Sequence, residues 1–396
     1  MALNLAIALL LIPAWVYLVG AAVAVCRFTR RPSFATPPAA RRQAYALGGQ
    51  SAEGQLPNPP AASMLKPLHG DEPGLYENLR SFAEQDYPTM QIVLGVNDPQ
   101  DSALPAARAV MRDLPSCDIA LVVDRRARGS NAKVANLENM LEVARHDLVV
   151  LADSDMRVDQ NYLATVTAPL LDPQIGLVTC LYKGASTGGI WSELGAQHIN
   201  FAFLPGALIA EALGLGGGCF GATIALRRDT LERIDWLTRL RDELADDHRI
   251  GDEVRALGLA VVLSHYVVEA RVTEPTLAAL WRHELRWART VRAVAPSGFA
   301  GSVLAHPVVV AALGAVATGF GLTSCLFLVI SLVLRWASTR VIAHALGVSP
   351  ATPWLLPMRD ALSFAVFVAS FFGRTVVWRD RVFCVEASGR MTVDGD

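Results

Sequence analysis

The chain has 396 residues, of which 52% are hydrophobic and only 18% charged, and its mean hydropathy is +0.34. Soluble domains carry about 25% charged residues, so this composition favours a membrane protein. The net charge of −2 excludes the strongly basic character of a nucleic-acid-binding chain, and we expect no nucleic-acid partner. The six cysteines lie far apart without a CxxC pair, which favours reduced thiols over a disulfide framework.

The first 27 residues predict a transmembrane anchor. Residues 2–26 are apolar and uncharged, and this length spans about 30 Å of hydrocarbon. A signal peptide is the alternative, although its apolar part usually has only about 7–15 residues. Because positive residues stay on the cytoplasmic side, we expect the chain after the anchor to be cytoplasmic, since arginines follow at Arg27, Arg30, Arg31, Arg41 and Arg42.

The next part of the chain predicts a linker and then an α/β domain. Residues 28–60 are rich in Pro, Ala, Gly and Gln, which is typical of a linker. Over 61–275, short apolar runs alternate with helical patterns, which predicts a mostly parallel sheet flanked by helices. The expected strands lie at 62–68, 91–96, 118–124, 147–153 and 175–182, and the expected helices at 74–84, 103–113 and 131–145.

Residues 276–300 predict an amphipathic helix at the membrane surface. Arg282, Arg286 and Arg289 recur at helical spacing, with Leu280 and Trp287 on the other side. A basic stripe opposite apolar residues is typical of an interfacial helix. An ordinary solvated helix face is the alternative.

The C-terminal residues 301–396 predict a transmembrane region with two or three spans. The apolar stretch 303–334 fits either a hairpin around Gly319–Gly321 or a single tilted helix, and the stretch 361–373 is short for a span. The Gly-rich apolar run 201–221 is too rich in glycine for a span and predicts either a wall of an acceptor site or buried core.

Two carboxylates follow an apolar strand in the sequence DLVVLADSDMRV. Asp153 and Asp155 come directly after residues 147–151, and ligands of open α/β sheets bind at the carboxyl ends of the strands. Carboxylate oxygens suit Mg²⁺ or Mn²⁺, and such an ion neutralises a diphosphate. The pair by itself is a weak motif, because acidic residues are common in loops.

Three further segments carry weaker signals. The acidic segment 241–248 either caps the helix that follows or contains a general base. In 128–136, Gly-Ser-Asn opens a helix beside Lys133, which favours an anion, although the spacing is not that of a P-loop. Asp98 follows the strand 91–96 and begins a turn.

Along the chain the motifs follow in the order Asp98, SNAKVAN, DSD, the Gly-rich run, ADDH and HELRW. This succession resembles inverting nucleotide-sugar glycosyltransferases of the family 2 and 21 type, and especially their ceramide glucosyltransferase branch. The resemblance covers residues 61–292, and the segments PLHGDEPGLYENLRSFAEQDYP, NAKVANL and LRWARTVRA look most similar to bacterial hopanoid-biosynthesis glycosyltransferases. It implies an α/β fold of the GT-A type between N-terminal and C-terminal transmembrane helices. It also implies the bacterial inner membrane as the location.

The resemblance implies a role for each acidic motif. Asp98 would hold the uracil or ribose of a UDP-sugar donor, and Asp153 with Asp155 would hold a divalent metal, Mg²⁺ or Mn²⁺, and the diphosphate. Asp247 would be the catalytic base. Lys133 would help to stabilise the departing UDP.

The segment HELRW takes the place of the branch's [Q/R]xxRW signature. Arg286 and Trp287 would lie near the diphosphate and the acceptor, whereas His283 departs from the Gln or Arg of the signature. The implied reaction is transfer of N-acetylglucosamine from UDP-GlcNAc to bacteriohopanetetrol, and the alternative is transfer of glucose from UDP-glucose to ceramide. The same motifs leave a polysaccharide synthase and a non-catalytic membrane scaffold open.

Overall fold

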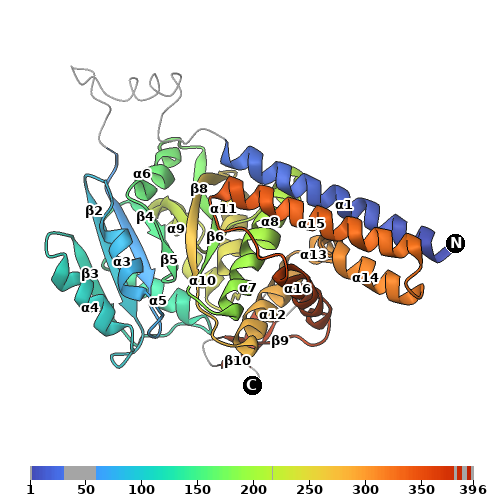
Figure 1. Cartoon of the computed structure of the whole chain (residues 1–396). Helices are drawn as coiled ribbons and strands as arrows, with labels where there is room; N and C mark the ends of the chain where they lie inside the picture. Colours follow the sequence, from blue (N-terminus) through green and yellow to red (C-terminus); the bar gives the residue numbers. More distant parts are fainter. Residues whose placement is uncertain (1, 31–58, 216, 379–380, 386–389, 394–396) are drawn as a thin grey trace. The chain divides into compact units, whose positions relative to one another are not determined.

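The computed structural model describes residues 2–30, 59–215, 217–378, 381–385 and 390–393 (Figure 1). The linker expected over 28–60 therefore lies almost entirely outside the described residues. The chain divides into two units. We call Arg31–Tyr182 with Cys219–Arg271 the sheet unit, and Met1–Arg30 with Lys183–Gly218 and Val272–Asp396 the helical unit.

An eight-stranded sheet in the order β3-β2-β1-β4-β7-β6-β8-β5 organises the sheet unit. The four strands β1 to β4 pair in parallel, whereas β7 pairs antiparallel with β4 and with β6, and β5 pairs antiparallel with β8. The expected α/β class is confirmed, and each of the five expected strands is present. The strands are β1 (Ala62–Pro67), β2 (Met90–Val96), β3 (Ile119–Val123), β4 (Leu148–Leu151), β5 (Met156–Arg157), β6 (Ile175–Ser186), β7 (Ile224–Arg227) and β8 (Ala260–Val272).

Helices cover both faces of this sheet. Because successive strand residues point to opposite faces, Met64 packs with the core that contains Leu79 and Val110, whereas Leu65 packs with the core that contains Val134 and Val254. The helices are α3 (Leu75–Ala83), α4 (Leu104–Asp113), α5 (Ala132–Leu141), α6 (Tyr162–Thr167), η1 (Ala168–Leu171), α9 (Arg228–Arg233), α10 (Trp236–Leu240) and α11 (Asp246–Ala256).

The helical unit consists mainly of helices and adds a small antiparallel sheet in the order β11-β10-β9. The run 201–221 contributes the end of a π-helical turn and all of α8. The elements are α1 (Ala2–Thr29), α7 (Ile190–His198), η2 (Ile199–Phe203), α8 (Leu204–Ala212), α12 (Leu277–Val294), α13 (Pro296–Gly301), η3 (Ser302–Ala305), α14 (Pro307–Ala317), α15 (Leu322–Leu346), α16 (Leu355–Ser370), β9 (Thr375–Trp378), β10 (Arg381–Val385) and β11 (Met391–Val393).

Among the residues that the structure describes, two helices are long and apolar enough to cross a membrane, α1 and α15, and they lie side by side (Figure 1). The indole of Trp15 on α1 donates to Ser331 Oγ on α15 at 2.9 Å. The apolar stretch 303–334 breaks between α14 and α15, so the hairpin prediction holds and the single tilted helix is wrong. A third candidate span forms only if Pro296–Ala305 and Pro307–Ala317, which are bent by 64°, count as one. Of the two or three C-terminal spans predicted, the described residues therefore offer α15, and a second only if the bent pair counts as one span.

Buried ion pairs join three helices of the helical unit. Arg359 on α16 pairs with Glu284 on α12 through two bonds of 2.6 and 2.7 Å, and its Nη1 also donates to the carbonyl of Leu194. The next residue, Asp360, accepts from Arg335 on α15. Truncation of one partner of such a buried pair costs about 3–5 kcal/mol, so these contacts fix α12 and α15 against α16.

Candidate active site

The end of β4 places Asp153 at the carboxyl edge of the parallel strands. All four residues of β4 are buried between β1 and β7, and Asp153 to Asp155 follow before β5 begins. Lys133 Nζ lies 2.6 Å from Asp153 Oδ1 and 3.9 Å from Asp246 Oδ2. The structure thus brings together three of the segments that the sequence singled out, 128–136, the pair Asp153 and Asp155, and 241–248.

Lys133 owes its position to the start of α5. The side chain of Asn131 caps this helix by accepting from the N–H groups of Lys133 and Val134, so the predicted helix start is confirmed. The Asn131 amide also donates to the carbonyl of Glu243. Burial by itself lowers the pKa of Lys133, but nearby carboxylates, led by that of Asp153, outweigh it and raise the pKa above the usual value.

Only the last three residues of the acidic segment 241–248 lie in the helix that follows, and Asp246 and Asp247 stand in its first turn. α11 begins at Asp246, and the residue before it makes no side-chain capping bond. Both oxygens of Asp247 accept backbone N–H groups, from Gly221 at 2.9 Å and from His248 at 2.8 Å. Two fixed bonds hold the Asp247 carboxylate in one orientation, whereas Asp246 lies buried beside Lys133.

Gly221 lies where these groups converge. A Cβ at this position would meet Asp153 Oδ2 at 3.2 Å, Lys133 Nζ at 3.3 Å and Asp247 Oδ2 at 3.4 Å. Any larger residue would therefore push against all three groups. The glycine is one of the residues of the site that the sequence prediction missed, and its place in a Gly-rich run was the available signal.

Lys66 is another residue that the sequence prediction missed. Its side chain is fully buried on β1, donates to the backbone carbonyl of Asp153 and lies 3.5 Å from the ring centroid of Phe82. Burial lowers the pKa of Lys66 to about 7, while Asp153, Asp155 and Glu72 act in the opposite direction. A lysine inside the apolar run ASMLKPL was the signal in the sequence.

Asp155 lies among other carboxylates. Burial, and then the charges of Glu72 and Asp153, raise the pKa of Asp155, and Lys66 opposes them. Burial also raises the pKa of Asp246 and Asp247. We call the five acids the carboxylate cluster: Glu72, Asp153, Asp155, Asp246 and Asp247.

The carboxylate cluster suits a divalent cation. Its acids outnumber Lys66 and Lys133, and carboxylates close together are stabilised by a cation beside them. Among the described residues no three acidic, His or Cys side chains form a complete metal site. Mg²⁺ commonly needs only one or two carboxylates when phosphate oxygens and water complete its shell, so Asp153 and Asp155 fit such an ion.

Asp98 is exposed and starts a turn, as the sequence predicted. Its Oδ1 accepts from the N–H of Gln100 at 2.9 Å and from Arg125 at 3.1 Å. The backbone bond and the arginine lower the pKa of Asp98. Its role in donor binding stays a prediction.

Arg286 and Trp287 lie on α12, in the helical unit. The Trp287 ring packs against His283 and Phe203, with centroids 4.3 and 6.4 Å away, and Glu274 holds the His283 ring through its Nδ1. Their role near the diphosphate stays a prediction.

The basic stripe of α12 is not wholly free to meet a membrane. Arg289 donates to the carbonyls of Phe372 and Thr375, and Arg292 to that of Gly373. Arg289 therefore binds the end of α16 and the start of β9, and the interfacial role of the stripe stays a prediction.

Comparison with known proteins identifies the family. The sequence profile of Glycosyl transferase family 21 matches residues 18–391. The chain belongs to this family. As a family 21 enzyme it is a hexosyltransferase, as the sequence predicted.

Relatives of this family 21 enzyme include ceramide glucosyltransferases. Ceramide glucosyltransferase 1 of Caenorhabditis elegans is 22% identical over 352 residues, which cover 85% of this chain and 74% of the relative. Ceramide glucosyltransferase of Gibberella zeae is 26% identical over 136 residues, which cover 32% and 26%. The fold is similar to that of the mannosyltransferase PcManGT from Pyrobaculum calidifontis, solved with GDP-Man and Mn²⁺, with a TM-score of 0.50 at 16% identity over 93% of this chain and 99% of that one.

The contacts of Gly221 predict that this residue is needed for turnover. Gly221→Ala should lower turnover by about tenfold, because a shift of a few tenths of an ångström suffices to misplace the carboxylates and a 1 Å shift costs about 10²-fold. Gly298→Ala is the control, since a Cβ there meets nothing within 4 Å. Release of UDP from a UDP-sugar measures both variants. Equal rates for Gly221→Ala and the wild type would contradict the assigned convergence.

Proposed function

We propose that this family 21 enzyme transfers a hexose from a UDP-sugar to the hydroxyl group of a membrane lipid, with inversion. The observation that carries the proposal is the carboxylate cluster at the carboxyl edge of the sheet, in which Lys133 contacts Asp153 and Asp246. Two helices of membrane-spanning length in the same chain support a lipid acceptor. The names of the relatives support it as well.

Asp247 is the proposed general base. Its carboxylate is fixed by two backbone N–H groups, and burial raises its pKa, which makes it a better proton acceptor. It would take the proton of the acceptor hydroxyl as the oxygen attacks the anomeric carbon. General base catalysis of this kind contributes about 10²–10⁴-fold.

Lys133, Asp153 and Asp155 form the proposed diphosphate site. Asp153 and Asp155 would hold a divalent metal, which supplies positive charge that stabilises the leaving UDP. The ammonium group of Lys133 contacts Asp153 and can place a positive charge beside the same leaving diphosphate. We propose that Asp98 binds the uridine part and that Arg286 and Trp287 bind near the diphosphate and the acceptor.

The reaction is a single displacement. The bond from the acceptor oxygen to the anomeric carbon forms as the bond to UDP breaks, the proton passes to Asp247, and the electron pair leaves with UDP. A single attack inverts the anomeric centre, so an α-linked donor gives a β-linked product.

Two acceptors are supported by different observations. The relatives named ceramide glucosyltransferase support ceramide with UDP-glucose. The motifs PLHGDEPGLYENL and HELRW support bacteriohopanetetrol with UDP-GlcNAc through their resemblance to hopanoid enzymes. The positive residues after α1 support a catalytic domain in the cytoplasm, at a bacterial inner membrane.

A transfer assay tests the function. The full chain in detergent should release UDP and form a glycolipid when it is offered both donors and both lipids, with products identified by mass spectrometry. EDTA should abolish transfer and Mg²⁺ or Mn²⁺ should restore it, since the carboxylate cluster needs a cation beside the diphosphate. No glycolipid from either lipid would contradict the lipid acceptor, and full activity in EDTA would contradict the metal.

A pair of neighbouring substitutions tests the base. Asp247→Asn should keep donor affinity and lower turnover by about 10²–10⁴-fold, as measured by calorimetry and initial rates. Asp246→Asn is the matched control and should be milder, because Asp246 contacts Lys133 and is assigned to orientation. The opposite ranking would transfer the role to Asp246.

A further inference from the structure

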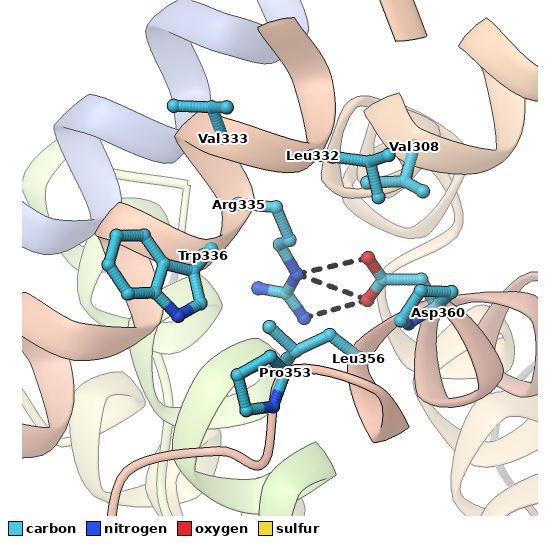
Figure 2. A pocket seen from close by; sticks show the side chains of 9 residues that line it. Val308, Leu332, Val333, Arg335, Trp336, Pro353, Leu356 and Asp360 are labelled. Carbon is cyan, nitrogen blue, oxygen red and sulfur yellow. Dashed lines mark hydrogen bonds and ion pairs between the residues drawn. The ribbon is translucent and has the colours of Figure 1, made fainter. Parts of the chain in front are cut away.

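A cavity opens in the helical unit beside the ion pair of Arg335 and Asp360 (Figure 2). It has a volume of about 240 Å³ and is lined by residues of α14, α15 and α16 and of the segment just before α16. Apolar side chains form most of its wall, among them Val308, Leu332 and Leu356. The guanidinium and the carboxylate provide its polar part.

The ion pair makes several hydrogen bonds and still has bonding capacity. Arg335 Nε and Nη2 donate to Asp360 at 2.9–3.1 Å, and Nη1 donates to the carbonyl of Phe201 at 2.9 Å. A guanidinium has five N–H donors and a carboxylate about four acceptor positions. The pair can therefore offer both a donor and an acceptor to a ligand.

Stability alone is a weak reason for this pair. Both side chains are buried, and well-packed apolar residues of similar volume often stabilise a protein as much as a buried ion pair does, or more. Arg335 lies within α15, which is long and apolar enough to cross a membrane. Ionisable residues inside such helices commonly mark the path of a substrate.

We propose that this cavity binds the acceptor lipid at the point where its hydroxyl or amide groups meet the hydrocarbon, an inference that rests on the proposed lipid acceptor. Asp360 neutralises Arg335, so the cavity carries no net charge from this pair and favours an uncharged lipid over an anionic one. A hydroxyl or an amide both donates and accepts hydrogen bonds, as the pair does. Hydrocarbon would contact Val308, Leu332 and Leu356.

The size of the cavity limits what it holds. Sites that enclose a whole small molecule have about 300–1,000 Å³, so a cavity of about 240 Å³ takes only part of a lipid. The remaining hydrocarbon can lie along the exposed apolar face of α15, where Val329 and Val333 are more than half exposed.

α16 connects this cavity to the helix that carries the RW pair. Asp360 lines the cavity, and its neighbour Arg359 pairs with Glu284 on α12, three residues before Trp287. A lipid in the cavity would therefore lie against the element that fixes α12. This connection favours the acceptor over a lipid that only surrounds the protein.

Photolabelling of the full chain in phosphatidylcholine nanodiscs tests lipid binding in the cavity without a sugar donor. A ceramide that carries a diazirine beside its amide should label peptides of α15 and α16. Leu332→Trp and, from α14, Val308→Phe fill the cavity, so each should lower labelling by about tenfold, which corresponds to about 1.4 kcal/mol of binding free energy. Leu326→Trp is the matched control, because Leu326 is an exposed residue of the same helix.

Competition identifies the ligand class. Unlabelled ceramide or bacteriohopanetetrol should displace the probe, and the stronger competitor indicates the acceptor. Displacement by phosphatidylglycerol alone, or equal labelling of Leu332→Trp, Val308→Phe and the wild type, would overturn the proposal. Labelling here without glycolipid formation would refute the proposed function and keep the site, whereas glycolipid formation without labelling would refute only the site.

Discussion

The removal of several carboxylates from water at one edge of the sheet is the constraint on which the sheet unit depends. Burial raises the pKa of Asp155, Asp246 and Asp247, so each ionised acid needs compensation. Lys133 provides positive charge through contacts with Asp153 and Asp246. Lys66 lies beside them and donates to the backbone carbonyl of Asp153. The shortage of positive charge that remains is the physical reason to expect a metal and a diphosphate site here.

The fold meets this constraint with backbone geometry. Asp153 follows a strand buried between two others, Lys133 follows the cap of α5, and Asp247 stands in the first turn of α11. Gly221 lets the three approach one another. The helical unit solves a comparable problem differently, because Arg359 and Asp360 on one turn of α16 bind partners on two other helices.

Local patterns predicted the elements, and three-dimensional contacts decided the site. The apolar run before Asp153 predicted the strand that ends at Leu151, and Asn131 marked a helix start. Lys66 and Gly221 were missed because their importance comes from neighbours distant in the chain. Helical spacing also did not show that Arg289 donates to the carbonyl of Phe372, because that residue lies far along the chain.

The stereochemistry of the product tests the central claim most directly, because one fixed base and one leaving diphosphate require a single displacement. The glycolipid formed from an α-linked UDP-sugar should be isolated and its anomeric configuration determined by proton NMR. The proposed site predicts the β-anomer alone. An α-linked product would show retention of configuration and would contradict the role of the carboxylate cluster as described.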